Sequence, residues 1–523
     1  MKAMIMQSNS WRMEGPTLRD NRTPNFDSGI ISEPMLMFGG GHRHVDPKTG
    51  IALYGPYSLQ GQTRAPLRSI TVGIVGPPPM IADAEAWLQG CKGMLTNDGS
   101  QPFLYPHFPG LNTSHPFECE LLHGEAWREP VRDSDIGLAL ARPTFEDQVS
   151  HLVDLYVNAV EVLATNDPKP DVVVCCIPQE VVDKCAVRRT GAVIRRARRP
   201  SRFRRVKEQL ELFQREIDEG ESGHQNLRRG LKADAMQFGM PTQLVWPSTL
   251  RLSDRVDGRT PRRQDIATRA WNFTTALYHK AGGSPWRLAE LEPGLCFVGI
   301  SFYREISGES PGMRTSMAQA FTAAGDGYVL RGNTFEWGEE KGRSPHLTKE
   351  LAASLLRDVI ELYKRQNRGS LPSRIVVHKS SRFWEEELEG IEEATNVIPR
   401  KDLVALGYRG LQFYRTGDYP ALRGTYVKFS ERDLLLYTTG YIPYLRTYPG
   451  ARVPQPLEVL EHHGDSPWDV VLREVLALTK MNWNTADFAC SEPITIAFSR
   501  RVGQILAEVP QDSRVQPEYK FYM

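Results

Sequence analysis

The chain has 523 residues, of which 40% are hydrophobic and 24% charged, and its formal net charge is +1. These values are ordinary for a soluble globular protein of about three domains. They exclude a globally basic chain, so any nucleic-acid site must arise from local clusters of cations. The 7 cysteines show no CxxC spacing, which fits reduced thiols rather than a disulfide framework or a zinc site.

Two features of the sequence bear on the location of the protein. The first residues lack a basic region followed by an apolar core. The longest apolar stretch, near residues 172–177, is too short to span a bilayer. We therefore expect a cytoplasmic protein that makes no membrane contact.

The amino-terminal part predicts strands and helices in alternation. Residues 1–34 are polar and aperiodic, and we expect a tail or an extended arm there. Residues 69–75 (SITVGIV) and 171–178 (DVVVCCIP) are typical of buried strands, and a helix is predicted over residues 145–164. This pattern favours a parallel, Rossmann-like sheet. No GxGxxG motif joins a strand to a helix, so a dinucleotide is not expected.

The densest positive charge lies in residues 188–207, RRTGAVIRRARRPSRFRRVK. Two interpretations stay open. The segment is either a solvated loop or insertion, or it contacts the phosphate backbone of a nucleic acid, which would make affinity strongly salt-dependent.

A basic helix is predicted shortly after residue 224. Arg228 and Lys232 are four residues apart and therefore share one face of this helix. The sequence G-M-P ends the helix, and a short strand over residues 242–246 follows, with Gln243 at its mouth.

A second helix, AWNFTTALYHK, carries Asn272 on its first turn and Lys280 on its last. Cations and amides that converge on one strand suit a compact anion such as a terminal phosphate. Arg and Lys supply charge, while Gln and Asn orient oxygens without adding charge. A solvated basic helix face followed by a capped helix explains the same residue types and remains open.

The order of these residues resembles the MID domain of Argonaute proteins: a basic face, then G-M-P-T-Q, then a helix with Asn that closes in K-x-G-G. In that family the constellation holds the 5′-phosphate of a guide strand. The resemblance therefore assigns this role to Lys232, Gln243, Asn272 and Lys280, with Arg228 one turn before Lys232.

The chain departs from the family pattern at two positions. Arg228 stands where the family has an aromatic residue or His, and Ala276 stands where it has a further lysine. The resemblance thus implies that one phosphate ligand is missing, or is replaced by Arg228 or by Mg²⁺ at the guide 5′ end. No organic cofactor is expected.

From residue 295 adjacent strands precede a helix, a strand and a helix, which is the outline of an RNase H-like domain. The segments VGIS, IVVHKSS, LRGTYV, LYTTG, LTKMNWN and EPITIAFSRRV are similar, in this order, to the PIWI domain of Argonautes. The fold class is therefore predicted to be α/β, with a Rossmann-like MID domain before an RNase H-like PIWI domain. The expected bounds are 1–67 for an arm and linker, 68–290 for MID and 291–523 for PIWI.

Nucleases of the RNase H type hold two divalent metals with several carboxylates at strand ends. Where cleaving Argonautes have two of these Asp residues, this chain has Ser301 and Ser380. Serine is neutral and cannot replace the charge that holds a hard cation, so we expect an inactive PIWI domain. An active guided nuclease that uses Glu336 and Asp487 with further ligands is one alternative.

The resemblance to short prokaryotic Argonautes implies a function in defence. Such a protein would bind a small 5′-phosphorylated guide RNA and recognise complementary single-stranded DNA of a plasmid or phage. It would form a heterodimer with an APAZ-domain partner and activate that partner's TIR, sirtuin-like or nuclease effector allosterically, with oligomerisation left open. We expect backbone contacts from Arg304, Lys379, Arg423 and Lys480. A non-guided structural or packaging subunit is the second alternative.

Overall fold

The computed structural model describes most of the chain. The described residues are 26–60, 65–97, 99, 101–185, 226–252, 264–304, 313–320, 327–335, 345–408, 410–413, 416–430, 434–450, 452–509 and 515–523. The basic segment 188–207 and the candidate carboxylate Glu336 lie outside these ranges.

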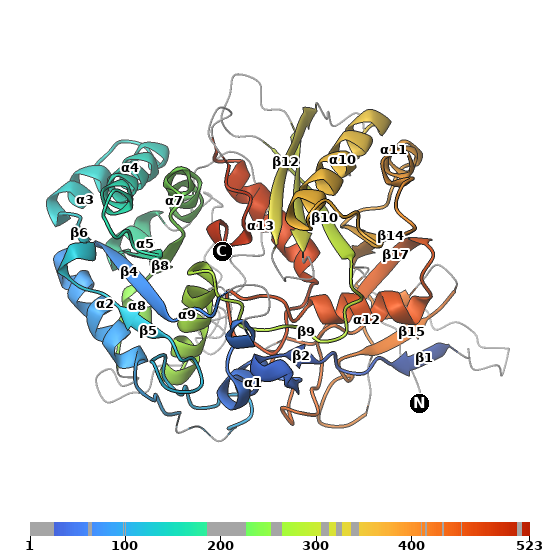
Figure 1. The fold of residues 1–523 in the computed structure, drawn as a ribbon, viewed down its shortest axis with the longest axis horizontal. Coiled ribbons are helices and arrows are strands. Elements are labelled where there is room, and N and C mark those ends of the chain that lie inside the picture. The colour runs from blue at the N-terminus through green and yellow to red at the C-terminus, as the bar shows by residue number, and fades with distance from the viewer. Residues whose placement is uncertain are drawn as a thin grey trace, which may run out of the picture.

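Two large sheets lie side by side, one in each half of Figure 1. The first sheet runs in the order β5-β4-β7-β8, with β6 also paired to β4, and all its pairings are parallel. Its strands are β4 (Ser69–Gly76), β5 (Glu120–Leu122), β6 (Arg128–Pro130), β7 (Val172–Cys176) and β8 (Thr242–Val245). The predicted parallel sheet is confirmed. Every residue of β7 is buried, as expected of a Val- and Cys-rich strand covered on both faces.

The second sheet has nine strands in the order β1-β15-β16-β17-β14-β13-β10-β11-β12. Its central strands β10 (Leu295–Arg304), β13 (Arg374–Lys379) and β14 (Arg400–Gly407) are parallel to one another. The others are β1 (Asp27–Ile30), β11 (Met313–Ala320), β12 (Tyr328–Phe335), β15 (Thr425–Lys428), β16 (Leu434–Leu436) and β17 (Leu457–Gly464). β15 and β16 form an antiparallel pair.

Helices cover both sheets (Figure 1). Those around the first sheet are α2 (Pro78–Cys91), α3 (Asp133–Leu140), α4 (Phe145–Ala164), α5 (Gln179–Cys185), α7 (Leu227–Ala235), α8 (Pro247–Leu250) and α9 (Ile266–Lys280). Those around the second are α10 (Lys349–Gln366), α11 (Glu385–Thr395), α12 (Trp468–Leu478) and α13 (Ile494–Leu506), while α1 (Pro47–Tyr54) lies between the halves. Thr144 and Thr348 cap α4 and α10 by accepting a backbone N–H at 3.0 and 3.4 Å. In the described part of the chain, no helix is both long enough and apolar enough to cross a membrane.

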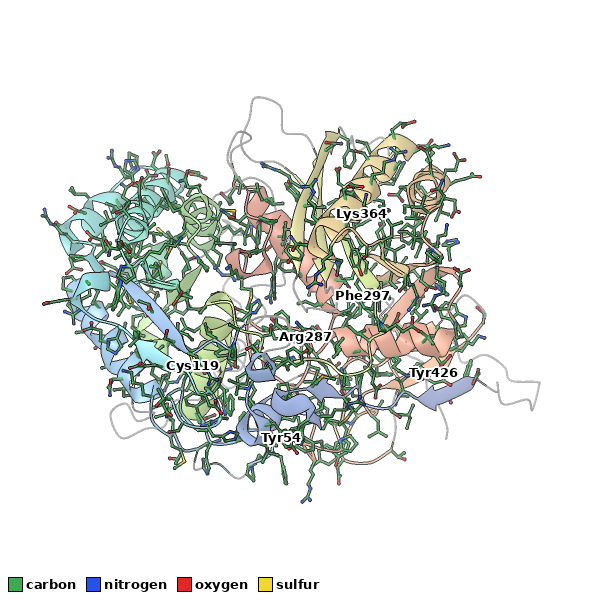
Figure 2. All side chains as sticks on the ribbon, in the orientation of Figure 1. Tyr54, Cys119, Arg287, Phe297, Lys364 and Tyr426 are labelled. Atoms are coloured by element: carbon green, nitrogen blue, oxygen red, sulfur yellow. The ribbon has the colours of Figure 1, made fainter. Side chains whose placement is uncertain are left out.

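The amino-terminal segment is built into the fold. β1 pairs with β15 at the edge of the second sheet. β2 (Leu36–Met37) pairs with β3 (Arg43–His44) and with β9 (Arg287–Leu288), which makes a small sheet between the halves. Figure 2 shows Arg287 in this region. Of residues 1–34, those that the structure describes therefore fit the extended arm and not the tail of the two expected alternatives.

One hydrophobic core continues from the first half into the second. Trp271 and Trp286 belong to the same cluster of buried side chains as Trp483 and Tyr519. The indole N–H of Trp286 donates to the carbonyl of Lys480 at 2.9 Å across this contact. The two halves therefore share a core instead of meeting across a polar linker.

Candidate nucleic-acid interface

Helix α7 carries the basic face that was predicted for the phosphate site. Asn226 caps the helix, because its side-chain oxygen accepts the backbone N–H of Arg228 at 3.0 Å. Lys232, four residues after Arg228, is only 2% exposed. The two cations thus share the helix, with the half-buried Arg228 nearer to solvent.

Lys232 and Lys280 converge on the first residues of β8. The Lys232 ammonium donates to the carbonyl of Thr242 at 3.1 Å, and the Lys280 ammonium donates to the side-chain oxygen of Gln243. Burial raises the pKa of the Cys175 thiol on β7 to about 12, and both lysines act against that rise. Both ammonium groups therefore lie near one point of the first sheet, together with Gln243.

Asn272 connects α9, the helix that carries Lys280, to the second half of the molecule. Its side-chain oxygen accepts the backbone N–H of Ala486 at 2.9 Å. Helix α9 begins at Ile266, earlier than predicted, because the Asp265 side chain caps it, so Asn272 lies in the second turn. The amide nitrogen is the part of Asn272 that is suited to an anion.

The predicted phosphate-binding residues Lys232, Gln243, Asn272 and Lys280 do not fit a resident Mg²⁺ ion. Mg²⁺ takes oxygen ligands in near-ideal octahedral geometry, usually one or two carboxylates with phosphates and water. Gln243 and Asn272 offer amide oxygens, and each already accepts a hydrogen bond. No group of three or more His, Cys, Asp or Glu able to hold a metal occurs among the described residues.

The two positions expected for catalytic carboxylates lie next to each other, where the parallel pairing of β10 with β13 ends. β10 and β13 are parallel, and Ile300 pairs with Lys379. Ser301 and Ser380 each lie one residue beyond that pair, with Ser301 buried and Ser380 exposed. Both side chains are neutral hydroxyls, so these two positions give a divalent cation no charge to bind.

His378 is unsuited to act as a base at this edge. Its ring is 1% exposed, and its Nδ1 lies 2.7 Å from the hydroxyl of Thr495. Burial lowers the pKa of His378 to about 3. Gly299, its partner across the strands, approaches Thr495 so closely that a Cβ would lie 2.0 Å from the carbonyl oxygen of Thr495. This region is therefore a tightly packed support for the strand ends.

Two curated relatives match about half of the chain, whereas no protein-family model matches it. The protein argonaute of Aquifex aeolicus is 24% identical over 253 residues, which cover 47% of this chain and 33% of the relative. The protein argonaute of Thermus thermophilus is 23% identical over 256 residues, covering 49% and 33%.

Solved structures match nearly the whole chain. Clostridium butyricum Argonaute bound to a guide DNA and a 19-mer target DNA gives a TM-score of 0.60 at 16% identity, covering 94% of this chain and 54% of that one. Drosophila Piwi gives 0.53 at 11% identity, covering 95% and 56%. The chain has an Argonaute fold. It spans about a third of the length of the curated relatives and about half of the solved ones. Below, "MID half" and "PIWI half" denote the regions around the first and second sheets.

Within this Argonaute fold Lys379 is an internal cation, contrary to the prediction of a nucleic-acid contact. It is 1% exposed, and its ammonium pairs with the carboxylate of Glu387 at 2.6 Å. The rings of Phe302 and Phe383 flank it, each with its centre 5.4 Å from the ammonium. Burial lowers the pKa of Lys379, and Glu387 acts against that change.

Arg423 and Lys480 are internal as well, so the predicted backbone contacts do not fit their positions. Both pair with Glu33, at 3.0 and 2.8 Å. Lys480 also donates to the carbonyls of Pro34 and Val45, at 3.1 and 2.6 Å, and burial lowers its pKa to about 8. These two cations anchor the amino-terminal segment to the PIWI half.

Two further predicted residues keep an open role. Arg304 is the last residue of β10, at the same sheet edge as Ser301, and its nucleic-acid contact stays a prediction. Burial raises the pKa of the Tyr105 phenol, and the charges of Asp265 and Asp487 add to that rise. Asp487 therefore lies near Tyr105, on the side of the MID half.

An ionic network at the opposite end of β13 was missed by sequence reasoning. Arg374 is 1% exposed and pairs with Asp402 and Glu474, each at 2.6 Å. His462 and Ser466 also bond to Asp402, each at 2.7 Å. No local motif signals this network, because its members come from separate strands, a loop and a helix. Its burial indicates a structural role.

Proposed function

We propose that this chain is the guide-binding subunit of a guided nucleic-acid recognition system. The observation that carries the proposal is the convergence of two buried lysines, Lys232 and Lys280, on the start of β8. Two ammonium groups that reach one strand end offer positive charge and N–H donors to a terminal phosphate. A protein of the same fold that was solved with guide DNA and target DNA supports this assignment.

The proposed guide is a small RNA with a 5′-phosphate, and the proposed target is complementary single-stranded DNA of an invading plasmid or phage. Base pairing would read the sequence, while the protein would sense phosphates and duplex shape. The choice of RNA rests on the resemblance to short prokaryotic Argonautes. Solved neighbours include one with guide DNA and one with externally bound siRNA.

The chain is further proposed to bind its target without cutting it. Ser301 and Ser380 occupy adjacent positions, each one residue beyond the parallel pair Ile300–Lys379, where carboxylates would hold metal ions. Mg²⁺ at the guide 5′ end would draw on oxygens of the guide itself, because the amide oxygens of Gln243 and Asn272 already accept hydrogen bonds.

The effector activity would reside in a cytoplasmic APAZ-domain partner with a TIR, sirtuin-like or nuclease domain. This part of the proposal rests on the family resemblance. For activation, target pairing must favour the active heterodimer through contacts that the inactive state lacks.

The nucleic acid that copurifies with the chain and its partner tests the proposal. Extraction and end-labelling should give short, alkali-labile, 5′-phosphorylated strands of narrow length. Strands of random length and end chemistry, or no strands at all, would overturn the proposal and favour a non-guided packaging role.

A further inference from the structure

Glu508 of the PIWI half reaches the helix that carries the proposed phosphate ligands. It follows the end of α13, and α13 packs against α7. One carboxylate oxygen of Glu508 accepts the backbone N–H of Asn226, the residue that caps α7, at 3.2 Å. The contact joins positions 282 residues apart, so it ties one half of the protein to the other.

The start of α7 is fixed from two sides. The Asn226 side chain accepts the backbone N–H groups of Arg228 and Arg229 at 3.0 and 3.4 Å. Glu508 holds the backbone of Asn226 itself. Lys232 lies on the same short helix, so a shift at Asn226 would move its ammonium relative to β8.

Glu508 is buried, unlike an ordinary surface glutamate. Its side chain is 8% exposed, and its second oxygen is buried without a hydrogen-bond partner in the described part of the chain. The charges of Arg229 and Asp234, both on α7, act on Glu508. Burial raises the pKa of Glu508 to about 7, and Asp234 adds to the rise while the Asn226 N–H and Arg229 oppose it.

We propose that Glu508 is a positioning residue for guide binding: from the PIWI half it fixes the start of α7, and its charge state adjusts how strongly that helix holds a guide phosphate. This inference rests on the proposed function. The Glu508 oxygen that accepts the Asn226 N–H can do so whether the carboxyl is charged or neutral, so this hydrogen bond fixes α7 in both states. The negative charge, when present, opposes a second anion held by the same helix.

Two variants of Glu508 distinguish the effect of its hydrogen-bond acceptor from the effect of its negative charge. Glu508→Gln keeps an acceptor for the Asn226 N–H and removes the charge, whereas Glu508→Ala removes both. Affinities for a 5′-phosphorylated and a 5′-hydroxyl guide of the same sequence are measured between pH 5.5 and 8. Glu492→Gln is the control, because Glu492 lies just before the other end of α13 and pairs with Arg500 at 3.1 Å instead of contacting α7.

Glu508→Ala should lower the preference for the 5′-phosphate by about three- to tenfold, the usual range for one hydrogen bond. Glu508→Gln should restore that preference. The parent and Glu508→Gln should agree at low pH and separate as pH rises through about 7, with the parent then weaker. The second ionisation of the phosphate, near pH 6, affects all proteins alike and cancels in the comparison.

The outcomes distinguish this inference from the proposed function. If the parent itself shows no preference for a 5′-phosphate, the proposed function fails. If the parent shows the preference but Glu508→Ala, folded by its thermal transition, matches it at every pH, only the role of Glu508 is overturned. Superimposable pH profiles of the parent and Glu508→Gln would also overturn the role of its charge.

Discussion

Lys232 and Lys280 are almost fully buried, and each donates to a neutral oxygen of β8. A long cationic side chain normally keeps its charge in water, and removing it from water is costly. Two such charges around one strand end make this place suited to an anionic ligand. At the scale of single residues, this arrangement is the feature most directly tied to binding.

Lys280→Met keeps the aliphatic stem and removes the charge. It should weaken binding of a 5′-phosphorylated guide by about 1.5–3 kcal/mol, the usual contribution of a charge-assisted hydrogen bond. Binding of a 5′-hydroxyl guide should change little. Titration of labelled guides measures both affinities, and Lys232→Met should behave in the same way. Equal losses for both kinds of guide would indicate a damaged fold instead of a lost phosphate contact.

Asp402→Asn should destabilise the PIWI half by about 3–5 kcal/mol, because it leaves the buried Arg374 short of a counter-charge. Urea denaturation followed by fluorescence measures the change. Glu292→Gln is the control, since Glu292 pairs with Arg400 at a surface where both are about half exposed, and it should cost less than about 1 kcal/mol. A loss no larger than that of the control would contradict the importance of the network.

The same network predicts a pH dependence. Burial alone would raise the pKa of Asp402, but hydrogen bonds from His462, Ser466 and Arg374 lower it from 3.8 to about 2. The stabilisation that this carboxylate contributes is therefore fully present above about pH 4 and is lost as pH falls towards 2. The stability difference between the parent and Asp402→Asn should shrink over that interval. A difference that grows on acidification would contradict the assignment.

Sequence reasoning brought Lys232, Gln243 and Lys280 together, as the structure does, but misplaced three other cations, and the reason is physical. Lys232, Gln243 and Lys280 occur within one stretch whose spacing can be recognised. Whether a cation such as Arg423 or Lys480 faces solvent depends on Glu33, which lies 390 and 447 positions away. Hydrophobic periodicity describes local faces, so it carries no information about such a distant carboxylate.

At the scale of elements, strongly patterned segments were predictable. The predicted helix over residues 145–164 has the bounds of α4, and the buried strands β4 and β7 lie where apolar runs placed them. β1 was missed because four mostly exposed residues have no apolar period to detect. Its place is set by pairing with β15, far along the chain.

Glu33→Ala should release this amino-terminal segment. The substitution leaves Arg423 and Lys480 buried without their carboxylate, which typically costs about 3–5 kcal/mol. Hydrogen exchange at the amides of residues 27–37 should accelerate before exchange in the central strands of the second sheet. Glu118→Ala is the control, because Glu118 pairs with Arg68 at an exposed site. Unchanged protection of residues 27–37 would show that strand pairing alone holds the segment.

At the scale of the whole molecule, the neutral side chains of Ser301 and Ser380 in the PIWI half predict that the protein recognises its target without cleaving it. The purified chain, loaded with a guide and supplied with Mg²⁺ or Mn²⁺, should leave a complementary labelled DNA intact. Ser301→Asp combined with Ser380→Asp places carboxylates next to each other, each one residue beyond the last β10–β13 pair, and should increase divalent-ion binding in calorimetry. A parent that cuts the DNA at a fixed distance from the guide 5′ end would contradict the prediction.

The core that Trp271 and Trp286 share with Trp483 and Tyr519 also limits how such a protein can change over generations. Exchanging one half with that of a distant homologue would bring together large aromatic surfaces that were never shaped for each other, and poor packing of such side chains costs several kcal/mol. A substitution in this shared core on the MID side therefore needs a compensating substitution on the PIWI side. The MID half, which would bind the guide phosphate, and the PIWI half, which would hold the duplex, should therefore evolve together.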